Sequence, residues 1–178
     1  MLSELHVKYG KQCFATRYSE SADKISRSVS VLFDRSVGAF MAADGDCRQI
    51  DVWGMLYALD VDFPLEPSIR QSIVTWLLQN RHRYLYKGQV CQLPDGQPWE
   101  KLLIEVPAGE YQNGAYWATA SGWALGFFRK YDPAFAEEML DELLADFESD
   151  GICECINEGY RKLPQFVVSA TNARGGLL

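Results

Sequence analysis

Several features that define other protein classes are missing from this 178-residue chain. It has only two histidines and no run of Lys or Arg, and its net charge is −7, so nucleic-acid binding has no electrostatic basis. No hydrophobic stretch reaches the length of a membrane span, so no membrane partner is expected. The sequence also lacks G-x-S-x-G, P-loop and G-x-G-x-x-G motifs. We therefore expect no cofactor and no mechanism built on those motifs.

The five cysteines are odd in number, and no secretion signal precedes them. Reduced thiols in the cytoplasm are the simplest interpretation. Cys153 and Cys155 are not in a zinc pattern, because a second pair of cysteines and nearby histidines are missing. We therefore expect a cytoplasmic protein without a metal site.

Hydrophobic periodicity predicts a single, mainly α domain over residues 1–178, and the chain is long enough to bury a core. The predicted helices cover residues 20–35, 49–60, 67–80, 112–130 and 133–148. Pro67 suits a first helical turn, Asp132 suits a cap, and Gly151 suits a helix end. The helices over 49–60 and 112–130 are apolar almost all round, which predicts an inner layer with their amino ends at a common cradle.

Two segments have extended character. Residues 83–107 contain the turn signal Asp95-Gly96 and several prolines, which predict a β-hairpin excursion rather than a central sheet. Residues 152–156 predict a short strand, and the polar tail after them has no strong period.

What the chain does contain is an unusual run, Gly-Glu-Tyr-Gln-Asn-Gly-Ala-Tyr-Trp, at residues 109–117. Polar side chains cost free energy when they are buried without partners, so a core helix needs no such acid or amides. Amides and carboxylates can bind sugar hydroxyls, and aromatic faces can stack on sugar rings. We therefore expect a carbohydrate ligand, with candidate contacts from Tyr111, Gln112, Asn113, Tyr116 and Trp117.

This run resembles the YxNG-x-W inner-helix entrance of six-hairpin glycosidases, a superfamily with glucoamylase-like, debranching-enzyme-like and cellobiose-phosphorylase-like members. Residues 49–58, Gln-Ile-Asp-Val-Trp-Gly-Met-Leu-Tyr-Ala, resemble the D-W-G-x-x-Y-A inner helix of the same toroids. The resemblance spans roughly residues 20–178 and implies a partial (α/α) toroid of helical hairpins that binds sugar at one mouth. Since a full toroid needs six hairpins, it also implies a missing N-terminal half, or completion by another chain or a second copy.

Three carboxylates are candidates for acid/base chemistry, which in inverting glycosidases needs two carboxyls on either side of the bond. Glu154 would lie between two isoleucines on one strand face, where an apolar cover favours a protonated acid, or on an exposed edge. Glu110 and Asp51 lie near predicted helix starts, where each carboxylate could equally be a cap. Trp53 could be a stacking platform or a core residue.

The sequence therefore predicts part of a glycoside hydrolase or phosphorylase. Two alternatives remain: a sugar isomerase or epimerase, and a non-catalytic toroid module or subunit. The first depends on histidines, and neither histidine lies in the motif-rich region. The second is favoured by the small number of predicted hairpins.

Overall fold

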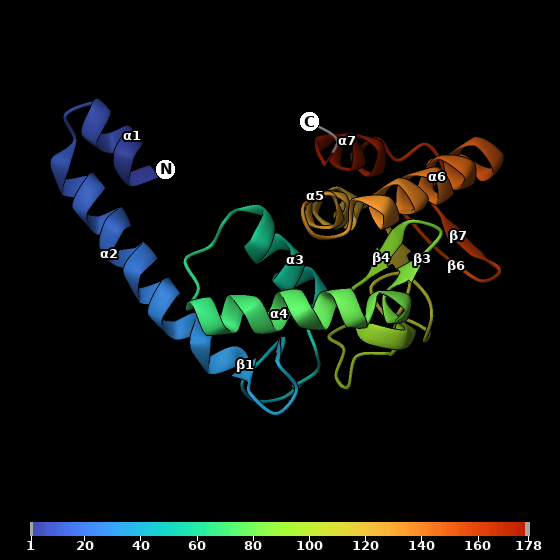
Figure 1. Cartoon of the computed structure of the whole chain (residues 1–178), viewed down its shortest axis with the longest axis horizontal. Coiled ribbons are helices and arrows are strands. Elements are labelled where there is room, and N and C mark those ends of the chain that lie inside the picture. The colour runs from blue at the N-terminus through green and yellow to red at the C-terminus, as the bar shows by residue number, and fades with distance from the viewer. Residues whose placement is uncertain (1, 177–178) are drawn as a thin grey trace.

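The computed structural model describes residues 2–176, and these form a helical arm joined to a mixed α/β body (Figure 1). The α-helices are Leu2–Lys8 (α1), Gln12–Val29 (α2), Val52–Asp60 (α3), Pro67–Gln79 (α4), Ser121–Tyr131 (α5), Pro133–Asp150 (α6) and Val167–Gly175 (α7). The strands are Phe33–Asp34 (β1), Ala39–Phe40 (β2), Leu85–Tyr86 (β3), Gln89–Cys91 (β4), Tyr116–Trp117 (β5), Cys155–Asn157 (β6) and Tyr160–Lys162 (β7).

A five-stranded antiparallel sheet overturns the predicted mainly α, partial toroid. Its strand order is β3-β4-β5-β6-β7, and β1 and β2 form a separate hairpin. The central pairings join segments far apart in the chain, since Val90 pairs with Trp117 and Tyr116 pairs with Ile156. Such non-local pairing leaves no local sequence period. Within the predicted excursion over 83–107, β3 and β4 do form a hairpin, but it is one edge of this sheet, and its turn lies between Tyr86 and Gln89 rather than at Asp95-Gly96.

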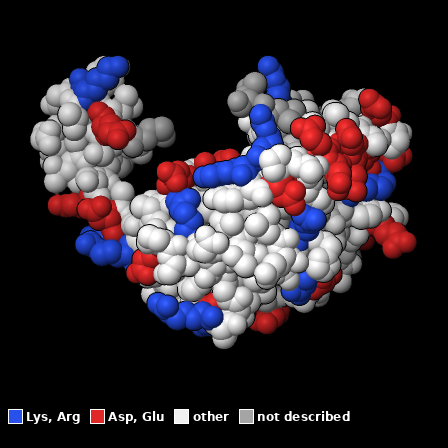
Figure 2. All heavy atoms as spheres, viewed as in Figure 1, with Lys and Arg blue, Asp and Glu red and all other residues white. Residues whose placement is uncertain are grey.

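The helices with clear caps lie where the sequence predicts them. The Asp132 side chain accepts a hydrogen bond from Phe135 N at the start of α6 (3.3 Å), and Gly151 follows the end of α6 with φ +81°. Pro67 is the first residue of α4. Acidic side chains gather over the outer face of α6, as Figure 2 shows.

Other helix boundaries were predicted wrongly. The helix expected over 112–130 begins only at Ser121, because the preceding residues form a turn, strand β5 and a short 3₁₀ turn. Its amino end does not open onto a cradle, because Ser121 is fully buried and donates a hydrogen bond to Gly88 O (2.7 Å). The first predicted helix begins at Gln12 and ends at Val29, and α1 and α7 were not predicted.

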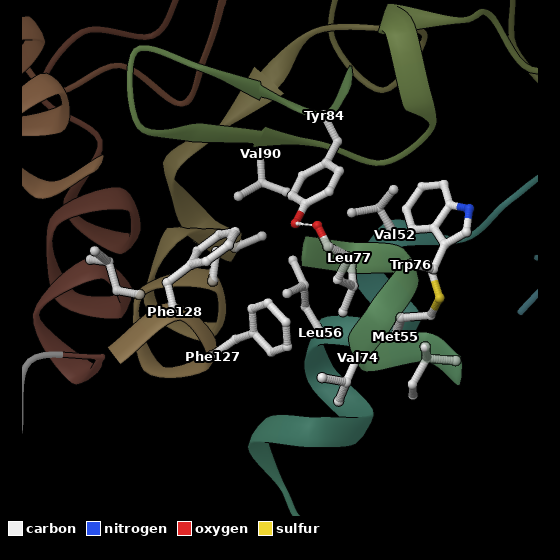
Figure 3. Packing of buried hydrophobic residues seen from close by; sticks show 14 of the residues in the cluster. Val52, Met55, Leu56, Val74, Trp76, Leu77, Tyr84, Val90, Phe127 and Phe128 are labelled. Carbon is white, nitrogen blue, oxygen red and sulfur yellow. Dashed lines mark hydrogen bonds between the residues drawn. The ribbon is translucent and has the colours of Figure 1, made fainter. Parts of the chain in front are cut away.

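The main core lies where α3, α4 and α5 meet strand β4 (Figure 3). Leu56, Leu77 and Phe128 are completely buried there. Tyr84 is also buried and donates its hydroxyl to Leu77 O at 2.9 Å, which satisfies the one polar atom it brings into the core. Burial raises the pKa of Tyr84 above its usual value.

A buried carboxylate connects α6 to both hairpins of the large sheet. The Asp146 side chain is 1% exposed and accepts hydrogen bonds from Arg161 on β7 (2.6 Å) and from Gln89 on β4 (3.0 Å). Lys87, in the turn between β3 and β4, adds an ion pair at 3.2 Å. Because a buried charge is tolerated only when it is paired and hydrogen-bonded, these contacts fix the position of the sheet against α6.

The helical arm, unlike the body, buries few of its side chains. Helices α1 and α2 bury only Ala15, and they expose several large apolar side chains, among them Leu5, Phe14 and Ile25. Five basic and three acidic residues give residues 2–29 a net charge of +2, whereas the whole chain carries −7.

We predict that Asp146→Ala destabilises the protein by about 3 kcal/mol, because two cations and the buried Gln89 amide lose their acceptor. Urea denaturation measures this as a lower midpoint. Asp150→Ala is the matched control: Asp150 also pairs with Arg161 (2.8 Å), but it is half exposed, so about 0.5 kcal/mol is expected. Equal losses in the two variants would show that the buried network is not the main constraint.

Candidate functional site

An open groove on the body is lined mainly by aromatic side chains. It has a volume of about 410 Å³, and we call it the aromatic groove. It collects residues from α3 and its cap, from α5, and from the loops after β2 and β4. Its walls are formed by Ala42, Asp51, Trp53, Gly54, Tyr57, Gln92, Trp99 and Trp123. Three indole rings, a phenol ring, an amide and a carboxylate therefore face one open space.

Trp53 is the centre of a row of rings that runs from the groove into the body. Its ring makes edge contacts with Trp123 and Trp117, with a centroid distance of 5.9 Å in each case. Its Nε1 donates to Val90 O (3.2 Å), which fixes the indole against strand β4. Tyr57 extends the row on the groove side, 5.1 Å from Trp123, and Tyr111 extends it on the inner side, 5.0 Å from Trp117.

Asp51 is the acid of the groove and the cap of α3. Its Oδ1 accepts a hydrogen bond from Gly54 N at 2.8 Å, which satisfies one unpaired donor at the helix start. Burial raises the pKa of the Asp51 carboxyl above 3.8, and the Gly54 hydrogen bond offsets this only in part. Gly54 also makes room for the carboxylate, because a Cβ there would lie 2.1 Å from Oδ2.

Glu154 lies at the inner end of the same row and does not line the groove. It is 7% exposed and therefore buried rather than on an exposed edge, but it precedes β6 and does not lie on the predicted strand face. Its Oε1 lies 3.5 Å from the Tyr111 hydroxyl, and its Oε2 has no protein partner although it is buried. Tyr111 holds a left-handed backbone (φ +44°), a conformation that costs a non-glycine residue free energy and clusters at functional sites.

The amides of the 109–117 run have mainly structural partners. Asn113 is 3% exposed, accepts from Trp99 N (2.8 Å) and donates to Val106 O (2.8 Å), so it is not free to bind hydroxyls. Gln112 is exposed at the surface, and its carbonyl accepts from Trp99 Nε1 (2.9 Å). Glu110 is partly exposed and closes a tight turn with Asn113. The Asn113 side chain and the Gln112 backbone carbonyl therefore fix the loop that carries Trp99.

The two aromatic residues of β5 lie on opposite faces of the sheet. Trp117 is opposite Val90 and packs with Trp53, whereas the Tyr116 ring lies tilted against Tyr86 with a centroid distance of 5.4 Å. The predicted pairing of Tyr116 and Trp117 in one pocket wall is therefore wrong. Trp117 itself is 7% exposed, so it supports Trp53 from beneath rather than facing the groove.

Four groove residues were missed as site residues: Tyr57, Gln92, Trp99 and Trp123. Trp123 falls within the apolar helix predicted over 112–130, where the sequence indicates a core position. Trp99 had a usable signal, since a tryptophan in a loop rich in proline and glycine has no helical or strand core to join.

Among residues 2–176, no group of three or more His, Cys, Asp or Glu is placed so as to hold a metal ion. No helix in this range is long and apolar enough to cross a membrane. The cysteines are all unpaired, and burial raises the pKa of Cys155 to about 12 and that of Cys91 to about 11. Neither thiol is therefore an activated nucleophile.

Comparison with family models, with curated proteins and with solved structures gives no match for this chain. The function is therefore inferred from the residues that line the aromatic groove.

We predict that Asp51→Asn is more stable than the wild type at pH 7 and equally stable near pH 3. Because the pKa of Asp51 is raised on folding, the folded state holds this proton more tightly than the unfolded chain. The protonated carboxyl of Asp51 therefore stabilises the folded state below pH 3.8, and this stabilisation is lost as the pH rises through its folded-state pKa. Asparagine keeps a capping oxygen without the buried charge. Thermal unfolding at both pH values measures the difference.

Asp51→Ala removes the cap as well as the charge, so we expect a loss of about 1 kcal/mol near pH 3 and a smaller loss at pH 7, where removal of the buried charge offsets part of it. If Asp51→Asn were less stable than the wild type by the same amount at pH 3 and pH 7, the carboxylate would carry no burial cost.

Proposed function

We propose that this chain binds carbohydrate in the aromatic groove and acts on glycosidic bonds, as part of a glycoside hydrolase or phosphorylase. One observation supports this most: three tryptophans, a tyrosine and an amide surround a carboxyl whose pKa is raised. Flat aromatic faces complement the apolar faces of sugar rings, while Gln92 and Asp51 offer partners to hydroxyls. An acid that keeps its proton nearer neutral pH can serve as a proton donor.

In this proposal Asp51 gives its proton to the glycosidic oxygen, and the bond between that oxygen and the anomeric carbon breaks. The leaving group departs as an alcohol. A water oxygen, or a phosphate oxygen in a phosphorylase, bonds to the anomeric carbon. Asp51 is the acid in this proposal because, of the three candidates, it alone lines the groove, whereas Glu110 and Glu154 lie outside it. The attacking water therefore loses its proton to the solvent, and a phosphate nucleophile needs no base.

The isomerase or epimerase alternative gains no support from the positions of the histidines. His6 lies on α1, where it stacks with Phe14 and Tyr18 at 5.4 Å and 5.2 Å. His82 lies in the 3₁₀ turn after α4. Neither residue lines the aromatic groove.

We predict that Trp123→Ala weakens oligosaccharide binding about tenfold, because the sugar loses one stacking face and Trp53 loses its neighbour. Tyr57→Ala, at a half-exposed position, should have a similar effect with little change in stability. Titration calorimetry with α- and β-linked gluco-oligosaccharides measures both. Tyr9→Ala, an exposed aromatic on the arm, is the matched control and should leave the affinity unchanged.

Asp51→Asn then separates an enzyme from a binding module. It should keep oligosaccharide affinity within a few-fold and abolish release of reducing sugar or sugar phosphate. Binding without product release by the wild type would favour a non-catalytic module, and unchanged affinity in both aromatic variants would remove the groove from consideration.

The arm favours a second role, self-association. We infer that its exposed apolar side chains contact a second copy, since the arm is basic (+2) and the whole chain acidic (−7). Exposed apolar surface of this kind marks interfaces.

We predict a dimer by light scattering that becomes monomeric in Phe14→Asn/Ile25→Asn. Added salt should weaken the dimer, because screening reduces the attraction between the unlike charges. Val37→Asn/Val167→Asn, two exposed apolar residues outside the arm, is the control and should remain dimeric. A monomer at every concentration tested would contradict this role.

A further inference from the structure

A second, almost wholly apolar pocket adjoins the aromatic groove. It has a volume of about 220 Å³ and lies among the end of α2, strand β2, helix α3 and the loop that follows α3. Leu32, Phe40, Val61 and Leu65 are among the side chains that form its wall. The only ionisable carboxylate in this wall is Asp51.

The pocket and the groove share one boundary. Asp51, Gly54 and Tyr57 line both of them, so the two hollows meet at the amino end and outer face of α3. The Tyr57 ring is half exposed and is held by Trp123 on the groove side. Asp51 is therefore placed at the junction between an aromatic, polar-edged surface and an apolar one.

The two sides offer different chemistry to a ligand. On the groove side, Gln92 Oε1 accepts a hydrogen bond from Trp99 Nε1 (3.3 Å), so that wall carries the Gln92 amide along with aromatic faces. On the pocket side, aliphatic and phenyl groups dominate. An oligosaccharide would bring hydroxyl groups against this apolar wall and leave them without partners, which costs free energy.

We propose that the ligand is a glycoside with an apolar aglycone, an alkyl or aryl group. The sugar lies in the aromatic groove, the aglycone fills the apolar pocket, and the glycosidic oxygen lies at Asp51, on the boundary. This proposal rests on the proposed function of the groove and names the substrate class of the same site.

The test uses the full chain and titration calorimetry with methyl, butyl and octyl glucosides of both anomers, kept below their micelle concentrations. Each methylene buried in the pocket should raise the affinity about fourfold, until the pocket is full. Butyl glucoside should therefore bind much more tightly than methyl glucoside. Equal affinity for all three chain lengths would overturn the proposal.

Val61→Asn places an amide in the pocket wall at a position that is already half exposed, so folding should be preserved. It should remove most of the gain from the octyl chain and leave methyl glucoside unchanged. Val31→Asn is the matched control, since Val31 is also exposed and lies outside this pocket. Ala58→Leu, which fills the pocket, should reproduce the loss. Equal effects of the two asparagine variants would contradict the assignment.

Failure of this proposal and failure of the proposed function give different results. If oligosaccharides and methyl glucoside bind in the groove but longer chains add nothing, the apolar pocket is not an aglycone site and the groove assignment stands. If octanol binds as tightly as octyl glucoside while no oligosaccharide binds, the site is not a sugar site. Absence of binding by any sugar would overturn both.

Discussion

The buried carboxylate of Asp146 is the contact on which the arrangement of the body depends. It lies on α6, yet its partners come from the turn between β3 and β4, from β4 and from β7. Removing a charge from water is costly, so the carboxylate is stable only where all of these donors converge. The two outer hairpins of the sheet are thereby held to one helix, and β5, which lies between them, is fixed as well. Because β5 carries Trp117 beneath Trp53, this constraint extends to the floor of the aromatic groove.

Local signals predicted the parts of the fold that depend on local physics. A cap, a first-turn proline and a helical period were enough to place α4 and α6, and Asp51 was expected near a helix start. The sheet could not be predicted in this way, because its central strands are only two or three residues long and their partners are distant in sequence. A strand this short has no readable alternation, so β5 was assigned to a helix.

The candidate site, like the fold, could be predicted from the sequence only in part. Trp53, Tyr111 and Trp117 were selected for their residue types, and the structure does bring their rings together. The role of Asn113 could not be predicted, because a buried amide that orders a loop has the same sequence signature as one that binds a ligand. Trp99 and Trp123 line the groove only because tertiary contacts bring them there. Trp99 comes from a loop, and Trp123 comes from a helix whose apolar sequence indicates the core.

The structural role of Asp51 as a helix cap requires less of the side chain than a chemical role does. A cap needs only a side-chain oxygen, and serine or asparagine supplies one without a buried charge. At this position the cap is a carboxyl whose pKa is raised by burial, and the glycine at position 54 leaves the space that its second oxygen occupies. An ionisable group whose pKa is shifted by burial and that lines a hollow is a candidate for function. The same carboxyl lies where the aromatic groove meets the apolar pocket, and it is the one carboxylate among the three residues that line both hollows, Asp51, Gly54 and Tyr57.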